Sequence, residues 1–339
     1  MNVTSAKTPT FRPDGTVAVP AFDLPVSPLV SEEAAAAQRA LAEAPPFSVS
    51  LAEGDVTAHR EAINAYVAPQ VEHLRKAFAV EVSHAEIAGV EVIDVTPAGG
   101  GHDPDRVLVN LHGGAFVIGW DGSALLESVP ISALGSYRVI SVNYRMAPEH
   151  RHPAAIEDVV AVYRALLDDY APGRIGIYGG SAGGVLSAQV AGWLPRHGLP
   201  QAGAVGIFGA GGAPFHAGES AYIAGYVDGS FAPPPPDGSP IEDITRGYFD
   251  GVDPRDPVAW PAYHLDVLEA FPPTLVITGT RAVDLSPAIY TNSQLLKAGV
   301  RSTLIVGEGM GHCHHYRLDL PEGRDAVEQI LSFFRENLT

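Results

Sequence analysis

From about His84 onward, short apolar runs alternate with longer stretches in which apolar residues recur every three or four positions. The short runs predict strands within 86–96 (two strands) and over 107–111, 138–144, 175–179, 204–209, 274–279 and 302–307. The longer stretches predict helices that begin near Pro153 and that cover 185–194 and 324–337. Because strands that alternate with crossover helices build a mainly parallel sheet, the pattern predicts an α/β fold.

The two regions outside this alternation differ from each other. Residues 1–47 are rich in proline and alanine, and one helix is expected after Ser31, which stands where an N-cap belongs. A second helix is expected over 55–76, where apolar residues repeat at three and four. Residues 211–261 are rich in glycine and proline, with four prolines at 233–236, and show no period. A structureless loop of that length is improbable inside a compact domain, so it should be a lid, a cap or a binding insertion.

The amino-acid composition and the net charge exclude several classes of protein. Of the 339 residues 46% are hydrophobic and 18% charged, which fits a packed globule of one large or two ordinary domains and excludes disorder. The net charge of −18 repels phosphate backbones and anionic lipids, so neither nucleic acid nor a membrane is expected as a partner. A single cysteine, Cys313, and no visible signal peptide or transmembrane helix make the cytoplasm the expected location.

The strongest chemical signal lies around Ser181. The apolar strand 175–179 runs directly into Gly179-Gly180-Ser181-Ala182-Gly183 and then into a helical stretch. This order is typical of a nucleophile elbow, in which a strained turn exposes the serine hydroxyl and small residues avoid clashes with the neighbouring strand and helix. The alternative is an ordinary tight turn between a strand and a helix. A phosphate-binding loop does not fit, because no lysine follows the glycines.

A second glycine turn supports the nucleophile. The strand 107–111 ends in His112-Gly113-Gly114-Ala115-Phe116. The backbone N–H groups of Gly113 and Gly114, with that of Ala182, would form an oxyanion hole, and His112 is expected to be a structural hydrogen-bonding group. Taken alone, the two glycines fit a simple tight turn equally well.

The general base is expected near the C-terminus. In folds with such a nucleophile elbow the order along the chain is serine, acid, histidine, which points to His312 in Gly309-Met-Gly-His312, just past the last strand. The adjacent His314 and His315 raise the alternative of a metal site. Neighbouring residues do not readily converge on one ion, and no second ligand set accompanies them, so no metal is expected.

Together these motifs resemble the hormone-sensitive-lipase-like carboxylesterases of the α/β-hydrolase superfamily. The matching residues are His112-Gly-Gly-Ala-Phe, Tyr144-Arg-Met-Ala-Pro-Glu-His150, Gly179-Gly-Ser-Ala-Gly-Gly184 and Gly309-Met-Gly-His312, in this order over nearly the whole chain. The resemblance implies an α/β-hydrolase fold, a cap of N-terminal helices over a pocket for a small ester, and no cofactor. We therefore divide the chain into an N-terminal arm and cap helices (1–80), a core (81–210 and 262–339) and a cap or lid insertion (211–261).

The chain departs from this family at three positions. The catalytic acid usually follows Gly-Thr-Arg, but here that residue is Ala282; Asp284, two residues later in the same turn, is the candidate acid. Gly180 replaces the supporting acidic residue that usually precedes the serine. Ala115 stands where a third glycine is common. The first departure leaves open whether Asp284 has taken over the role or the chain is a disabled or engineered hydrolase.

The sequence predicts a serine carboxylesterase for small short-chain or aryl esters, with Ser181 as nucleophile, His312 as base and Asp284 as orienting acid. An amidase with the same apparatus and an impaired hydrolase that only binds a ligand are the alternatives. Aromatic residues expected at the pocket are Phe116, Trp120, Phe215, Tyr222, Phe231 and Trp260. The end of the sheet would suit an isologous homodimer, although the oligomeric state stays open.

Overall fold

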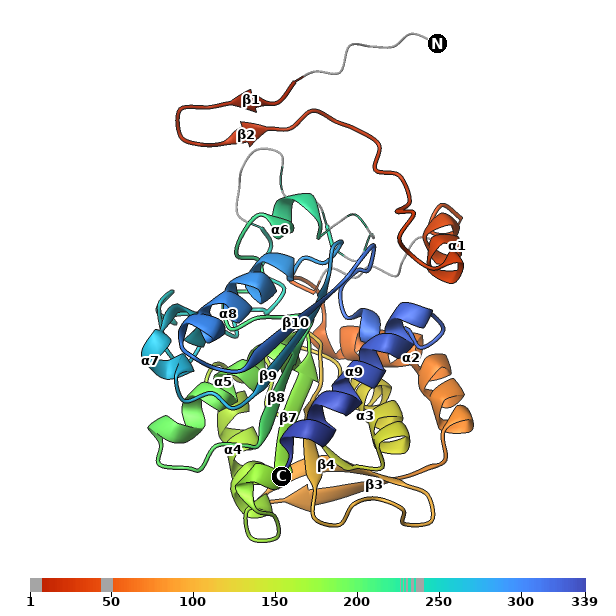
Figure 1. Ribbon diagram of the computed structural model, residues 1–339, viewed down its shortest axis with the longest axis vertical. Coiled ribbons are helices and arrows are strands. Elements are labelled where there is room, and N and C mark those ends of the chain that lie inside the picture. The colour runs from red at the N-terminus through yellow and green to blue at the C-terminus, as the bar shows by residue number, and fades with distance from the viewer. Residues whose placement is uncertain are drawn as a thin grey trace.

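The computed structural model describes residues 8–43, 51–225, 227, 229, 231, 232, 235 and 241–339. Within this part of the chain an eight-stranded sheet forms the centre (Figure 1), in the order β10-β9-β8-β7-β5-β6-β4-β3. The strands are β3 (Val80–Ile87), β4 (Val90–Pro97), β5 (Val107–Leu111), β6 (Arg138–Val142), β7 (Ile175–Gly180), β8 (Ala204–Phe208), β9 (Thr274–Gly279) and β10 (Ser302–Gly307).

The strands from β10 to β6 run parallel, whereas β3 pairs antiparallel with β4 and β4 pairs antiparallel with β6. Every residue of β5, β7, β8 and β9 is buried, as expected for central strands covered by helices on both faces. The predicted α/β-hydrolase fold is therefore confirmed.

Helices cover both faces of the sheet (Figure 1). One apolar core joins the sheet to α4 (Ala154–Leu166), α5 (Ala182–Arg196), α7 (Leu265–Leu268) and α8 (Leu285–Lys297). A second core joins the opposite face to α3 (Gly122–Gly135) and α9 (Pro321–Asn337), with α2 (Val56–Ala77) packed outside α3. The short elements are α6 (Ser220–Ile223) and the 3-10 turns η1 (Pro172–Arg174), η2 (Pro261–Tyr263) and η3 (His314–Tyr316).

The N-terminal region begins as an extended arm. It carries a small hairpin of β1 (Thr10–Phe11) and β2 (Val17–Ala18) that stands away from the body (Figure 1) and was not predicted. The helix α1 (Glu32–Ala40) has Ser31 as its N-cap, as predicted, and the Ser31 hydroxyl also donates to Glu322 of α9 at 2.9 Å. This contact anchors the end of the arm to the core.

The predictions of the elements were accurate in the centre of the sheet and weaker at its edge. Predicted and observed bounds of the central strands agree to within two residues. The two opening strands begin at Val80, six residues before the predicted start, because they form a hairpin whose half-exposed residues give a weak apolar pattern. The helix α3 was not predicted; it is apolar on all sides and contains Pro130, so it lacks the amphipathic signal. The division into arm, core and insertion stays a prediction, and most of the four-proline segment lies outside the described residues.

Burial of α9 on the sheet leads to a prediction about stability. Phe334 is completely buried, and it packs over Gly176 of β7, where a Cβ would collide with its ring. Phe334→Ala should lower the free energy of unfolding by about 3–5 kcal/mol, since it removes a large side chain from a close-packed core. Phe22→Ala, the same change at a residue that is 73% exposed, should alter it by less than about 0.5 kcal/mol. Urea denaturation measures both; equal effects would contradict the packing described.

Candidate active site

Ser181 occupies a strained turn between β7 and α5. Its backbone has φ 56° and ψ −121°, a conformation that costs energy and persists only where the surroundings enforce it. The Ser181 N–H donates to the carbonyl of Phe208 at 2.8 Å, which ties the turn to β8. A Cβ at Gly179 or at Gly183 would collide with the carbonyl of Leu111 at the end of β5. The glycines are thus needed for close backbone packing, as the sequence predicted.

The turn after β5 lies against the nucleophile. Gly114, Ala115 and Phe116 have φ values of 121°, 56° and 60°, and an ideal Cβ on Gly113 would lie 3.3 Å from Ser181 Cβ. Ala115 therefore adopts the left-handed conformation that favours glycine. Among the described residues, no hydrogen-bond acceptor satisfies the N–H groups of Gly114, Ala115 and Ala182.

A further backbone N–H, that of Ala115, lies near the predicted oxyanion donors. Ala115 and Ala182 line the cavity beside Ser181. The N–H of Gly113 instead lies close enough to the buried Glu127 carboxylate to favour its ionised form. The predicted donor Gly113 thus has a possible second acceptor in Glu127, and Ala115 is a further candidate donor beside Gly114 and Ala182.

His112 stays inside the fold. It is completely buried, its ring stacks on Tyr144 at a centroid distance of 4.3 Å, and its Nδ1 lies 2.8 Å from the Gly113 carbonyl. Burial lowers the pKa of His112 to about 4, so the ring is neutral near pH 7. The Tyr144 hydroxyl donates to the His112 carbonyl at 2.6 Å. His112 thus fixes the glycine turn, which agrees with its expected structural role.

His312 and Asp284 come together through their side chains. His312 Nδ1 lies 2.6 Å from Asp284 Oδ1, and the hydroxyl of Thr278 on β9 donates to Asp284 Oδ2 at 2.6 Å. Asp284 is completely buried and precedes α8, with its side chain turned away from the helix terminus toward the histidine loop. Ala282, at the position where the family usually has the acid, is also buried. The turn thus presents its carboxylate two residues later than usual.

The surroundings raise the tendency of His312 to hold a proton. Burial alone would lower its pKa, but the neighbouring Cys313 and the Asp284 carboxylate more than offset that effect, and the pKa of His312 is raised above its ordinary value. Burial also raises the pKa of the Cys313 thiol, so the thiol is neutral near pH 7, and the hydrogen-bonded partner of the imidazole is the Asp284 side chain. His312 is therefore built to accept a proton and to be stabilised as an imidazolium.

No hydrogen bond joins Ser181 to His312 within the residues that the structure describes. The imidazole Nε2 instead contacts Cys313 Sγ at 3.6 Å, and the rings of Phe215 and Phe231 each lie 5.3 Å from the His312 ring. Catalytic hydrogen bonds are often long in ligand-free enzymes and tighten when substrate binds. Phe215, whose ring lies 5.3 Å from the His312 ring, also lines the cavity that contains Ser181, and this residue links the two groups.

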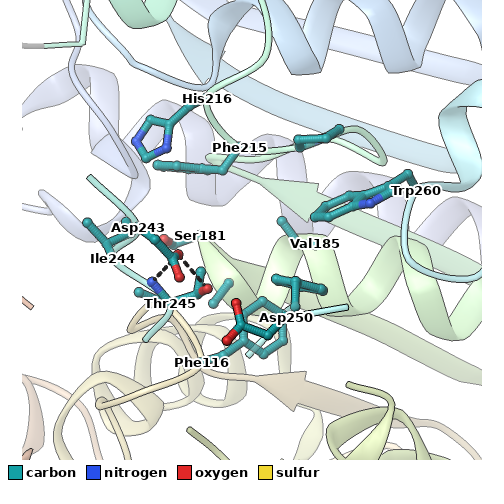
Figure 2. A pocket seen from close by; sticks show the side chains of 14 residues that line it. Phe116, Ser181, Val185, Phe215, His216, Asp243, Ile244, Thr245, Asp250 and Trp260 are labelled. Carbon is teal, nitrogen blue, oxygen red and sulfur yellow. Dashed lines mark hydrogen bonds between the residues drawn. The ribbon is translucent and has the colours of Figure 1, made fainter. Parts of the chain in front are cut away.

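A cavity of about 410 Å³ opens over Ser181 (Figure 2). Figure 2 shows Phe215 and His216 on one side, Phe116 and Asp250 on the opposite side, and Trp260 facing Asp243 across the space. The other lining residues are Ala115, Ala182, Val185, Pro214, Ile244, Thr245 and Phe249.

Three of the aromatic residues expected at the pocket, Phe116, Phe215 and Trp260, line this cavity. Trp120 lines a separate hollow with Arg60, and Tyr222 is 57% exposed. Asp243 and His216 also line the cavity and were not predicted, because their only signal in the sequence is their place in the aperiodic insertion. Asp243 accepts from the N–H and hydroxyl of Thr245 (Figure 2), and these bonds outweigh burial and lower its pKa, so it supports the wall in ionised form.

No group of three potential metal ligands occurs in the described part of the chain, His314 and His315 included. Burial lowers the pKa of both histidines, to about 4 for His314, so both rings are neutral near pH 7. None of the described helices has the length and the apolar character needed to cross a bilayer.

Comparisons with known proteins agree with this geometry. A model of the α/β-hydrolase fold family matches residues 108–316. An acetyl-hydrolase of Streptomyces hygroscopicus is 34% identical over 233 residues, which make up 68% of this chain and 75% of that protein. The crystal structure of an esterase has a TM-score of 0.79 at 29% identity and covers 95% of this chain and 99% of its own. An esterase of the bacterial hormone-sensitive lipase family has a TM-score of 0.75 at 27% identity, covering 91% and 99%.

These matches extend over the sheet, the Ser181 turn and the loop of His312, and the proteins found are esterases or an acetyl-hydrolase. The chain belongs to the α/β-hydrolase fold family and is a carboxylesterase of the hormone-sensitive-lipase-like type.

Proposed function

We propose that this carboxylesterase hydrolyses small esters through an acyl-enzyme on Ser181. The observation that carries the proposal is the 2.6 Å contact between His312 Nδ1 and the buried Asp284. The strained Ser181 lines a cavity together with Phe215, whose ring lies 5.3 Å from the His312 ring. Ser181 Oγ attacks the acyl carbonyl while His312 takes its proton, and the imidazolium then protonates the leaving alcohol. Water, activated by the same histidine, releases the acid and restores Ser181.

The oxyanion would be held by the N–H groups of Gly114, Ala115 and Ala182. All three lack an acceptor within the described residues, and Ala182 begins α5, so that the positive end of the helix dipole faces the developing charge. The strain at Ala115 fits such a role, because strained backbone is retained where it fixes a functional group.

The cavity favours a short acyl or aryl group. A volume of about 410 Å³ lies at the small end of ligand pockets, and its walls are largely apolar, with Phe116, Val185 and Trp260 among them. The acetyl-hydrolase relative supports the same substrate class. We therefore expect a small ester as the ligand of this cavity. The homodimer suggested by the sequence stays a prediction.

The structure and the relatives do not favour the two alternative functions, a ligand-binding protein without activity and an amidase. The impaired, ligand-binding reading rested on Ala282, but Asp284 makes the contact that Ala282 lacks. The amidase hypothesis has no observation in its favour, and the relatives reported above are named as esterases or as an acetyl-hydrolase.

The triad can be tested by turnover of p-nitrophenyl acetate. Ser181→Ala should abolish acyl-enzyme formation, and Asp284→Asn should lower kcat by about four orders of magnitude, because His312 loses its orienting anion. Asp266→Asn, at an exposed aspartate of α7, serves as the matched control and should be neutral. Ala282→Asp should not raise activity. A nearly inactive parent that Ala282→Asp restores would contradict the assignment of Asp284.

The pH dependence of kcat/KM gives a separate test. His312 must be unprotonated to act as base, so the acid limb of the profile reports its pKa. Because Asp284 holds that pKa up, Asp284→Asn should move the acid limb to lower pH as well as reduce the rate. Profiles of the parent and of the residual activity of the variant are compared. A limb that stays in place would show that Asp284 does not act on the titrating group.

Substrate length tests the cavity. Acetate and butyrate esters should exceed the dodecanoate ester in kcat/KM by at least about tenfold, since the long chain exceeds the enclosed space. Trp260→Ala widens the cavity and should raise the ratio of long-chain to short-chain kcat/KM. Trp193→Ala is the control, because Trp193 stacks on His197 outside the cavity. A ratio that shifts equally in both variants would remove Trp260 from the substrate site.

A further inference from the structure

A buried carboxylate that the triad does not use lies beside the active site. Glu127, in the middle of α3, is only 2% exposed. Its Oε2 accepts from the Asn110 side-chain amide at 2.9 Å and from the Gly180 N–H at 3.1 Å. Its Oε1 accepts from the hydroxyl of Tyr316. The Gly113 N–H is a further donor near the same group.

These donors belong to the three segments that hold the catalytic groups. Asn110 and Gly113 flank the start of the turn that carries the free oxyanion donors. Gly180 is the residue immediately before Ser181. Tyr316 closes η3, four residues after His312. One carboxylate therefore hydrogen-bonds to the strand that leads into the oxyanion turn, to the residue before Ser181 and to the histidine loop at once.

The space that a side chain at residue 180 would occupy is filled by this network. A Cβ added at Gly180 would collide with the Tyr316 hydroxyl and would lie 3.2 Å from Glu127 Oε1. The nucleophile turn is therefore supported from outside, by α3 and the histidine loop, and not by a side chain of its own. The network continues to β6, because Ser141 donates to the Asn110 side-chain oxygen at 2.9 Å.

No cation compensates Glu127 among the described residues. The titratable groups that face it are the phenols of Tyr144, Tyr178 and Tyr316 and the thiol of Cys313. Burial raises the pKa of each, so all four are neutral near pH 7. Burial also raises the pKa of Glu127 to about 7, although its hydrogen bonds oppose that shift. A buried carboxylate without a counter-ion costs stability, so its presence calls for another explanation.

We propose that Glu127 is a positioning residue of the esterase, whose carboxylate holds Ser181, the oxyanion donors and His312 in their relative places. The inference rests on the proposed serine mechanism. A carboxylate suits this task because both oxygens only accept, and each can take two donors. A displacement of about 1 Å between reacting groups can cost about a hundredfold in rate, so joining three segments at one point has a direct effect on kcat.

The amide of glutamine cannot serve all the donors. In Glu127→Gln the carbonyl oxygen can keep Gly180 and Asn110, but the NH₂ group then faces Tyr316, so the phenol must point its proton elsewhere and accept a weaker, neutral hydrogen bond where it had donated to a carboxylate. Tyr316→Phe breaks the same link from the other side. We expect each variant to lower kcat about tenfold with KM unchanged within about twofold, since the substrate cavity does not include either residue.

The double variant Glu127→Gln/Tyr316→Phe should have a kcat no lower than the worse single variant, because both changes remove one shared contact. Tyr178→Phe is the matched control. The Tyr178 hydroxyl is buried near Glu127 and has no hydrogen-bond partner in the described part of the chain, so its loss should leave kcat unchanged. Single variants with kcat within twofold of the parent, or losses that multiply in the double variant, would overturn the proposal.

Thermal denaturation separates positioning from a structural role. Because the folded-state pKa of Glu127 is raised, the native state loses stability as pH rises through about 7, and at pH 8 it carries the cost of the ionised carboxylate. The neutral amide avoids this cost. Glu127→Gln should therefore leave Tm at pH 8 equal to or above that of the parent while kcat falls. A lowered Tm, or a loss of kcat matched by a loss of titratable Ser181, would assign Glu127 a structural role only.

A second test, which does not depend on the choice of ester substrate, measures the rate at which a fluorophosphonate labels Ser181. Ser181 Oγ displaces fluoride from phosphorus and its proton goes to His312, and mass spectrometry locates the adduct. Slower labelling in Glu127→Gln and Tyr316→Phe, but not in Tyr178→Phe, supports the positioning role even if the ester tested is a poor substrate. An active parent with unchanged labelling in both variants would refute it and leave the esterase function intact. Absence of labelling in the parent would refute the serine mechanism and the proposal with it.

Discussion

The active centre depends on the close backbone approach between the end of β5 and the turn after β7. The carbonyl of Leu111 lies against Gly179 and Gly183 so closely that no side chain fits at either glycine. This approach seats α5 directly over the sheet and presses Ser181 into its strained conformation. It also brings Gly113 next to Ser181, so that the oxyanion turn and the nucleophile form one surface. Backbone packing at this edge of the sheet thus determines where Ser181 and the oxyanion turn lie relative to each other.

Two carboxylates near this surface have opposite environments. Asp284 touches an imidazole that can become cationic, and Thr278 supplies a second hydrogen bond. Glu127 has only neutral donors, and burial raises its pKa to about 7. A charge with a cationic partner can stabilise an imidazolium that forms during the reaction, whereas a charge with neutral partners can only organise them. The surroundings of each group, and not its residue type, therefore determine its part in the site.

The sequence predicted those parts of the fold and of the active site that are determined by consecutive residues. Buried apolar runs predicted the central strands, and the glycines around Ser181 predicted the tight turn, because both features are encoded in consecutive residues. Asp284 could be named as a candidate, but choosing it over a lost acid required knowing how the turn directs its side chain. Glu127 left no trace, since it lies inside an apolar helix that itself gave no amphipathic signal. Its donors come from residues far apart in the chain, and only the folded sheet brings them together.

The cavity wall formed by residues 243–245 depends on a contact between two other distant segments. Arg246 donates to the carbonyls of Leu51 and Glu53 and, at 2.9 Å, to that of Gly54, just before α2. Because the planar guanidinium binds three carbonyls at once, it fixes the loop of Arg246 against residues 51–54. That loop carries Asp243, Ile244 and Thr245, all of which line the cavity. The region before α2 thus anchors the loop of the aperiodic insertion that forms one wall of the cavity.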